Sequence, residues 1–400
     1  MPDGMGLELV VAAAMGGLAT MACYALGGRS KDWLHGWRAL GWLVLATLWA
    51  MGGAAFAARF TRGLGAVTHL SDTFPWGLWI AFDMLGGVAL AAGGFLMAGA
   101  VYVFRLERFH SILRPAILTA YLGYLLAVGG LLADLGRPYN IWHPIVYWQH
   151  RSVMFEVAWC VTLYTTVLTL EFLPLLLERF RWARALRLVR AFTAPLVIAG
   201  IILSTLHQSS LGSLFLIVPQ KLLQLWYTPL LPLFFFMSAL AVGMAMLIFE
   251  STVSARAFGR SLHRSQITAL ARAMPVVLVP YLLLRVLDIT WHDGWAAAFQ
   301  HPLQGATFLV EMLLLLVPTL VLLRAGWVGN AKVAFWASMA VVVGVVLNRL
   351  NVCWIGMLPS AEIPYVPSWR EIVITVNLLS YGIVLFGLAA RYLPLFEEHD

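Results

Sequence analysis

Ionisable side chains lie inside long apolar segments of this 400-residue chain. A charged group at the centre of a membrane helix costs at least about 2.5–3.5 kcal/mol, so each such group suggests a function. Asp83 follows an aromatic run that begins at Trp76, and His207 follows an apolar segment that starts near residue 188. A carboxylate and an imidazole in a pocket walled by aromatic rings would supply the hydrogen bonds and the proton acceptor that a two-electron quinone needs. The same residues could instead cap loops, so quinone chemistry is one interpretation of them.

The candidate quinone-binding residues have polar or aromatic side chains near one end of the expected helices. They are Asp83, His207, Trp76, Trp79, Glu156 and Ser210. A supporting polar shell is expected from Asp134, Arg137, Arg285, Asp288 and Arg349. An alternative for Arg285 and Asp288 is a structural ion pair that joins helices.

Two further carboxylates, Glu171 and Glu311, lie deeper in their apolar segments. Buried acids at this depth can relay protons, so both are candidates for a proton relay. Glu171 precedes Phe172-Leu173-Pro174 and could instead lie at a kink near the inner interface. No residue is expected to bind a metal ion or to act as a catalytic residue in its own right.

The elements that position these groups must be membrane helices. Hydrophobic residues make up 61% of the chain, charged residues 11%, and the mean hydropathy is +0.84, whereas soluble domains carry roughly 25% charged residues. Spanning segments must be helices or closed barrels, and long unbroken apolar runs favour helices. Such runs lie near 7–27, 38–60, 76–104, 113–135, 152–178, 188–206, 228–250, 272–290, 303–323, 333–350 and 371–391. The sequence predicts an all-α polytopic membrane protein, a bundle of about ten or eleven transmembrane helices without a separate soluble domain.

Orientation follows from the distribution of Lys and Arg. Under strict alternation of the predicted helices, most of the 26 basic residues fall on one side, which is therefore expected to be cytoplasmic. This places the N-terminus outside and the C-terminus inside. The outer loops, rich in Trp, Tyr, Pro and His, are then near 61–75, 136–151, 207–227, 291–302 and 351–369. Because the basic residues are spread among loops and not gathered on one face, the net charge of +7 does not indicate nucleic-acid binding.

Cysteine and histidine usage argues against a redox cofactor in this chain. Three scattered cysteines are too few for an iron–sulfur cluster. A membrane haem b is held by paired histidines on facing helices, yet nearly all ten histidines fall in loops. We therefore expect no haem and no iron–sulfur cluster, so that electrons would reach a quinone from a cofactor in a partner subunit.

Four motifs carry a resemblance to a known family. They are Phe74-Pro75-Trp76-Gly77-Leu78-Trp79-Ile80-Ala81-Phe82-Asp83, Asp134-Leu135-Gly136-Arg137-Pro138, Phe155-Glu156 and His207-Gln208-Ser209-Ser210-Leu211-Gly212-Ser213-Leu214. In these segments the chain resembles the NrfD/PsrC family of quinone-interacting membrane subunits. It most resembles the long branch, which contains the HybB-type subunit of periplasm-facing nickel–iron hydrogenases. That branch also contains membrane subunits of sulfite-reduction-linked and high-molecular-weight cytochrome complexes, which the motifs do not separate.

The resemblance implies a cofactor-free membrane subunit of a respiratory oxidoreductase in a bacterial or archaeal cytoplasmic membrane. Its partners would be a ferredoxin-like iron–sulfur subunit docked on the periplasmic face and a catalytic subunit, with hydrogen:quinone oxidoreduction favoured. Electrons would pass to or from menaquinone or ubiquinone near that face. The resemblance covers 38–400, so the segment within 1–37 departs from it as an additional N-terminal helix and cytoplasmic loop. Proton translocation, the quinone species and the direction of electron flow stay open.

Alternatives of other classes remain. A membrane subunit of a sulfur-metabolism redox complex is the nearest alternative. A secondary transporter also lines its site with intramembrane charges, but usually near the midplane and between inverted repeats, whereas here the charges gather toward one leaflet and no repeat is evident. A passive anchor for an external partner would leave the buried carboxylates unexplained.

Overall fold

The computed structural model describes residues 33–396, which are largely helical. The long helices are α2 (Trp33–Arg62), α5 (His110–Asp134), α7 (Val153–Arg179), α9 (Thr193–Ser213), α10 (Leu231–Ala257), α11 (Arg264–Trp291), α13 (Pro302–Leu323), α15 (Ala331–Cys353) and α16 (Trp369–Tyr392). Shorter helical pieces are η1 (Leu64–Ala66), η2 (Trp79–Gly86), α3 (Gly87–Leu90), α4 (Gly93–Ala98), η3 (Gly99–Val103), η4 (Glu107–Phe109), η5 (Pro138–Asn140), α6 (His143–Val146), α8 (Ala183–Ala191), η6 (Leu214–Ile217), α12 (Trp295–Gln300), α14 (Ala325–Val328) and η7 (Ile355–Ser360). Within 33–396 no strand is formed, only an isolated bridge between Ser71 and Phe74.

Ten helical segments of the described chain are long and apolar enough to cross a membrane. They are Leu40–Arg62, Trp79–Val103, Glu107–Asp134, Val153–Arg179, Thr193–Ile217, Leu231–Ala257, Arg264–Trp291, Pro302–Leu323, Ala331–Ser360 and Trp369–Tyr392. The prediction of an all-α polytopic membrane protein is confirmed. The predicted helix at 7–27 lies outside the described residues.

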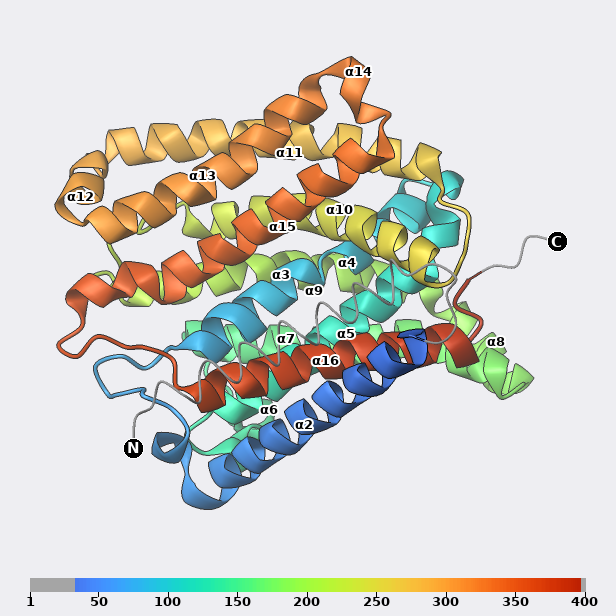
Figure 1. The fold of residues 1–400 in the computed structure, drawn as a ribbon, viewed down its shortest axis with the longest axis horizontal. Coiled ribbons are helices and arrows are strands. Elements are labelled where there is room, and N and C mark those ends of the chain that lie inside the picture. The colour runs from blue at the N-terminus through green and yellow to red at the C-terminus, as the bar shows by residue number, and fades with distance from the viewer. Residues whose placement is uncertain (1–32, 397–400) are drawn as a thin grey trace.

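Eight of these spans form two rings of four helices (Figure 1). The first ring consists of the Trp79–Val103 segment, α5, α7 and α9, and the second of α10, α11, α13 and α15. In each ring every helix packs against the next in chain order, and the last packs against the first. The rings meet where α10 lies along α9 and α4 and where α15 reaches η2. The pair α2 and α16 lies outside both rings and packs on α5.

Glycines allow the two rings to approach closely. Between the rings, a Cβ added to Gly243 of α10 would lie 3.0 Å from the backbone nitrogen of Gly93. Within the first ring, one added to Gly94 of α4 would lie 2.5 Å from Cβ of Ala120 on α5. Small residues at helix crossings are typical of membrane bundles. The glycine pair near residue 93 therefore serves packing and does not form a cofactor motif.

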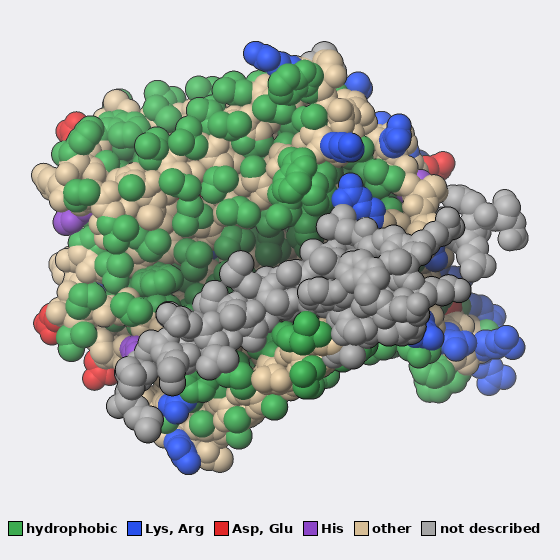
Figure 2. Space-filling view, viewed as in Figure 1, with side chains coloured by type: hydrophobic (Ala, Val, Ile, Leu, Met, Phe, Trp, Pro, Cys, Tyr) green, Lys and Arg blue, Asp and Glu red, His purple; other side chains and the backbone are tan. Residues whose placement is uncertain are grey.

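The two ends of the bundle differ in side-chain type. The end with residues 63–78, 135–152 and 354–368 is here called the aromatic end, and the end with residues 179–192, 258–263 and 324–332 the basic end. Figure 2 shows Lys and Arg mainly at the end where Figure 1 shows α8 and α14. This distribution agrees with the sorting of most basic residues to one side that the sequence predicts.

The span that carries Asp83 is not a uniform α-helix. It has π-helical turns at Trp79–Gly86 and Gly99–Val103 and a break at Ala91–Ala92. π turns inside membrane or soluble helices are rare and often mark functional sites. Asp83 lies within the first of these π-helical segments, at the start of the first span of the first ring.

Candidate functional site

Asp83 is held between α5 and α16. Its side chain is 6% exposed, and the Thr375 hydroxyl donates a 2.7 Å hydrogen bond to Oδ2. On the opposite side Asp83 packs against Gly130, where an added Cβ would lie 2.6 Å from Cβ of Asp83. The position of the Asp83 carboxyl group therefore depends on the Thr375 hydroxyl of α16 and on the space that Gly130 leaves on α5.

A second carboxyl group, Glu371, lies one helical turn before Thr375 on α16 and is fully buried. The Tyr365 hydroxyl and the backbone N–H groups of Ser368 (2.9 Å) and His69 (3.3 Å) donate to it. Burial and the facing Glu371 carboxylate raise the pKa of the Tyr365 hydroxyl above its ordinary value, so this hydroxyl remains a donor. Glu371 fixes the start of α16 as part of a capping box with Ser368.

Trp79, a predicted quinone-binding residue, belongs to this same region. Its indole N–H donates to the Glu371 carbonyl oxygen at 3.2 Å, and the ring packs in an apolar cluster with Ala133 and Ile374. Trp76 is half-buried and packs edge-on against Phe215, with ring centroids 5.4 Å apart. The two tryptophans therefore do not wall one pocket, because Trp79 faces α16 and Trp76 faces the segment that follows α9.

Asp134 ends α5 beside a buried arginine. The Arg59 Nε donates to the Ala133 carbonyl at 2.5 Å, and its Nη2 donates to the Leu135 carbonyl. These bonds satisfy carbonyls at the helix C-terminus, where a cation is also favoured by the helix dipole. Oδ1 of Asp134 is buried without a hydrogen-bond partner. Arg137, the next predicted shell residue, is exposed.

His207 lies inside α9, not at its end as the sequence predicted. The apolar segment was expected to stop near residue 206, but the helix continues to Ser213, with the Ser210 side chain bonded to its own helix and the Gln208 side chain bonded to α3. The Gln208 amide donates to the Val88 carbonyl at 2.9 Å, and the Ser210 hydroxyl donates to the His207 carbonyl at 3.1 Å. Ser210 therefore turns back onto its own helix.

The His207 imidazole is fully buried, and neither ring nitrogen has a hydrogen-bond partner. Its ring lies 5.6 Å from that of Tyr124, which meets the ring of Tyr164 at 4.6 Å. The hydroxyls of Tyr124 and Tyr164 are also buried and lie near that of Ser204, and none of the three makes a hydrogen bond of ordinary geometry within the described residues. Buried polar atoms in proteins are nearly always hydrogen-bonded, so a group of five unpartnered atoms indicates a place for a ligand or for water.

Asp83 and His207 face the same helix at different depths. Asp83 packs at Gly130 and His207 at Tyr124, six residues apart on α5, which corresponds to about 9 Å along the helix axis. No hydrogen bond joins them within the described chain. Glu156, another predicted quinone ligand, is exposed in the first turn of α7.

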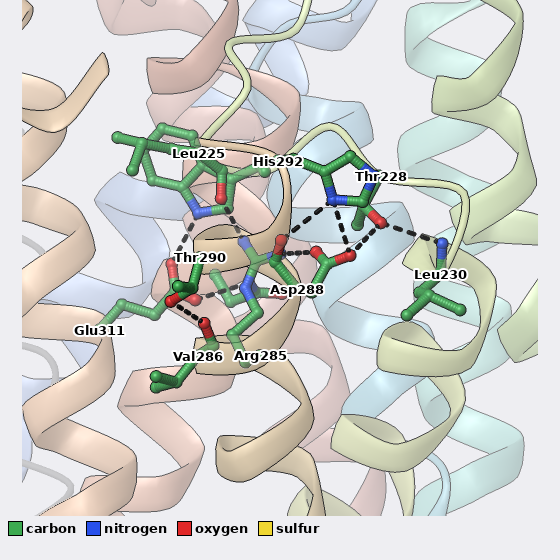
Figure 3. Close-up of polar contacts among 11 residues, drawn as sticks. Leu225, Thr228, Leu230, Arg285, Val286, Asp288, Thr290, His292 and Glu311 are labelled. Atoms are coloured by element: carbon green, nitrogen blue, oxygen red, sulfur yellow. Dashed lines mark hydrogen bonds and ion pairs between the residues drawn. The ribbon is translucent and has the colours of Figure 1, made fainter. Parts of the chain in front are cut away.

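A second polar cluster lies in the second ring (Figure 3). Arg285 Nη2 donates to the Leu225 carbonyl at 2.7 Å, and its Nη1 lies 3.9 Å from Asp288 Oδ2. The Thr228 hydroxyl donates to Asp288 Oδ1 at 2.7 Å, and the His292 ring lies 3.4 Å from the same oxygen. These contacts tie the loop before α10 to α11, and the Arg285–Asp288 pair lies within α11 instead of joining two helices.

Glu311 and Arg349 complete this second cluster. The fully buried Glu311 carboxyl group accepts from the side chains of Trp226 (3.0 Å), Asn348 (2.8 Å) and Asn351 (2.7 Å). Arg349 donates to Oδ1 of Asn348 at 2.6 Å, so one amide bridges acid and base. The sequence predicted Arg285, Asp288 and Arg349 as a shell around Asp83, but all three lie in the second ring. There Arg285 pairs with Asp288, and Arg349 donates to Asn348 and Ser238.

Glu171 lies toward the basic end of the first ring. Its Oε1 lacks a hydrogen-bond partner and lies 3.4 Å from the position that a Cβ on Gly200 would occupy. It lines a cavity of about 280 Å³ together with Arg114, Glu178 and Arg190. Glu171 is seven residues from both Tyr164 and Glu178, a spacing that places all three on one face of α7.

A model of the polysulphide reductase NrfD family matches residues 66–359, the part of the chain that contains both rings. The chain belongs to this family. Helices α2 and α16 lie outside the matched residues, yet Thr375 and Glu371 of α16 contribute to the Asp83 region.

Curated relatives of this NrfD-family chain align along most of their length. It is 39% identical over 372 residues to a protein of Nitratidesulfovibrio vulgaris (strain Hildenborough), with 89% of this chain and 94% of the relative covered. It is 34% identical over 344 residues to the "Probable Ni/Fe-hydrogenase 2 b-type cytochrome subunit" of Escherichia coli (strain K12), with 84% and 87% covered. It is 28% identical over 373 residues to the "Menaquinone reductase, integral membrane subunit" of N. vulgaris, again with 84% and 87% covered. The resemblance to the quinone-interacting NrfD family is thereby confirmed.

The name of the E. coli relative raises the question of a haem b. Such a haem is held by two histidines on facing helices. Among residues 40–396, His207 is the one histidine that is buried, so these side chains do not fit a bis-histidine haem. The expectation of a chain without haem stays a prediction.

Proposed function

We propose that this chain exchanges electrons between membrane quinone and an iron–sulfur subunit docked at the aromatic end, as the membrane subunit of a hydrogenase-type respiratory complex. The observation that carries the proposal is the unpartnered His207 imidazole beside the unpartnered Tyr124 hydroxyl, buried in the family-matched first ring. The names of the E. coli and N. vulgaris relatives, a hydrogenase subunit and a menaquinone reductase subunit, support the complex type and the substrate. A sulfur-metabolism complex is the alternative within the same class.

Quinone chemistry requires hydrogen-bond donors for two carbonyl oxygens and a group that takes or gives protons. In this proposal His207 and Tyr124 bind and orient the head group, because their rings lie 5.6 Å apart and their buried polar atoms lack partners within the described residues. Asp83 holds or accepts a proton at the shallower position, where Thr375 fixes its carboxyl group. Neighbouring apolar side chains exclude bulk water from the site.

The aromatic end is proposed to face the periplasm, with the C-terminus inside, because most basic residues lie at the other end. Exposed aromatic side chains in the loop between α5 and α7 support a docking role for this end. They are Tyr139, Trp142, Tyr147 and Trp148. Aromatic residues are enriched at protein interfaces, where they provide large contact area. The loop is therefore the proposed contact for the iron–sulfur subunit.

Proton supply from the basic end is a further part of the proposal. Tyr164, Glu171 and Glu178 follow one face of α7, and Ser204 and Gly200 follow the facing side of α9. Glu171 Oε1 and the Tyr164 and Ser204 hydroxyls lack partners, so waters between them would complete their hydrogen bonds. Glu171 is the proposed relay along this column. Glu311, the other sequence candidate, already accepts three hydrogen bonds and is better suited to a structural role.

The test uses the assembled complex, with quinone reduction and dye-linked activity of the partner measured in parallel. Asp83→Asn and His207→Ala should abolish quinone reduction and leave dye-linked activity intact. Asp72→Asn and His301→Ala are matched controls, because both residues lie at the same end and outside the proposed docking loop. Quinone turnover in Asp83→Asn and His207→Ala equal to that of the controls would end the assignment.

The proton column has its own test in sealed proteoliposomes. Glu171→Gln should slow proton uptake from the basic side and quinone turnover together, whereas the exposed Glu107→Gln at the same end should change neither. Normal uptake in Glu171→Gln would remove the relay and leave the quinone site untouched.

A further inference from the structure

The segment 179–192, here called the α8 patch, projects from the basic end. It links α7 to α9 and contains five arginines within twelve residues, 179–190. No residue of α8 is fully buried. Figure 2 shows basic side chains gathered beside hydrophobic ones at the corner where Figure 1 labels α8. The segment therefore presents a mixed basic and apolar surface.

The α8 patch is strongly amphipathic. At 100° per residue, Arg184, Arg187 and Arg190 fall on one half of the helix, while Leu186 and Val189 fall on the other and are half-buried. A short helix with a basic half and an apolar half lies stably at a membrane–water interface, parallel to the bilayer. This arrangement differs from that of the spanning helices beside it.

The charges of the α8 patch are largely uncompensated. Arg190 Nη2 pairs with Glu178 Oε1 at 2.6 Å. Four other arginines are exposed, and the described chain supplies no ion pair or hydrogen bond to their guanidinium groups. They are Arg179, Arg181, Arg184 and Arg187. Four free guanidinium groups close together repel one another unless anions from outside the chain neutralise them.

Aromatic and aliphatic side chains in the patch point to lipid as the source of those anions. Phe180, Trp182 and Phe192 are more than half exposed, and Trp at this depth is typical of an interfacial anchor. Exposed apolar side chains continue from the patch along α9 at Ile198 and Ile202. The apolar surface is thus continuous with the lipid-facing surface of the first ring, which an acidic soluble protein would not cover.

We propose that the α8 patch binds the phosphate groups of anionic phospholipids in the leaflet at the basic end. The planar guanidinium group of arginine donates paired hydrogen bonds to two phosphate oxygens. The aromatic side chains of the patch lie at the boundary between the lipid headgroups and the acyl chains. This binding is independent of the quinone reaction. It anchors the loop between α7 and α9, the two helices that carry Glu171 and His207.

The experiment measures phosphatidylglycerol retained by the purified complex from an equimolar mixture with phosphatidylcholine, by native mass spectrometry. Each basic residue near an anionic surface strengthens attraction about fivefold, so Arg184→Gln combined with Arg187→Gln should weaken retention about 25-fold. Arg184→Lys combined with Arg187→Lys keeps the charge and should keep most of the lipid. Wild-type folding of each variant is read from unchanged dye-linked activity and assembly.

The matched control removes the same charge elsewhere at the basic end. Arg324→Gln combined with Lys332→Gln changes two exposed residues, one just after α13 and one in the first turn of α15, and should leave retention near the wild-type value. Equal loss in both double variants would assign the effect to net charge and overturn the site. Unchanged phosphatidylglycerol retention in the α8 double variant would overturn the proposal as well. So would the finding that this variant keeps the lipid but loses a bound acidic soluble protein.

Discussion

Replacing Thr375 by Val tests how the protein holds Asp83. The Thr375 hydroxyl is the hydrogen-bond donor that the described chain supplies to the Asp83 carboxyl group, at 2.7 Å. Valine keeps the branched shape and removes the donor, leaving a buried carboxyl oxygen unpartnered. A hydrogen bond to a charged group contributes about 1.5–3 kcal/mol. Since about 1.4 kcal/mol corresponds to tenfold in rate, quinone turnover should fall by about tenfold to a hundredfold if that bond is used in the reaction.

The assay compares quinone reduction with dye-linked activity in the assembled complex, and separates kcat from KM. Thr375→Ser restores the hydroxyl and should restore most of the turnover, which a defect in packing alone would not do. The loss should appear in kcat, because Thr375 is a positioning residue for Asp83 and not a contact of the quinone tail. Wild-type turnover in Thr375→Val, or equal losses in the Val and Ser variants, would refute the role assigned to this bond.

Three further predictions concern the surroundings of the site. Gly130→Ala should displace Asp83 and destabilise the bundle by about 1–3 kcal/mol. Gly129→Ala should destabilise it less, because the added Cβ would meet a flexible Leu378 side chain at 3.2 Å. Thermal unfolding of the complex measures both effects. Arg59→Gln should lower the melting temperature because two carbonyls of α5 lose their donors, while the exposed Arg62→Gln should leave it unchanged. The chain purified without its partners should show no haem Soret band, and a stoichiometric band would contradict the expectation of a chain without haem.

The sequence predicted the membrane class and the spans because both depend on the length and hydrophobicity of local segments. The predicted run 76–104 corresponds to the span Trp79–Val103, and 371–391 to Trp369–Tyr392. The π turn around Asp83 was not predictable, since it arises from how this segment packs against α5 and α15. The extension of α9 beyond His207 was missed because Gln208 and Ser210 resemble loop residues until their bonds are seen, one to the Val88 carbonyl of a neighbouring helix and one to α9 itself.

The grouping of polar residues was harder to predict than their presence. The polar residues lie at similar depths in their predicted helices, which suggested that they form a single cluster. Depth along a helix, however, does not specify which helices pack against one another. The chain closes two separate rings, so Arg285 and Arg349 belong to the second ring and Asp83 to the first. Tyr124, Tyr164 and Ser204 were missed because an isolated hydroxyl in an apolar run is common. The spacing of seven from Tyr164 to Glu171 and of three from Ser204 to His207 is the signal that would have linked them.

Glu371 was also missed, since it lies at a helix start where a capping acid is ordinary. Its burial depends on the loop with Tyr365 folding over it, a tertiary contact with no local sequence signal. Arg59 falls at the end of the predicted run 38–60, and its burial against the end of α5 was not predicted. In each case the deciding partner is distant in sequence.

The central claim is that quinone binds in the first ring beside His207 and Tyr124. A photoreactive quinone analogue applied to the assembled complex, followed by peptide mapping, tests it most directly. The account predicts saturable labelling of peptides from 79–90, 118–130 and 200–213, reduced by excess unlabelled quinone and lost in His207→Ala. Labelling confined to second-ring peptides around Asp288 and Glu311, or no competition by quinone, would contradict it.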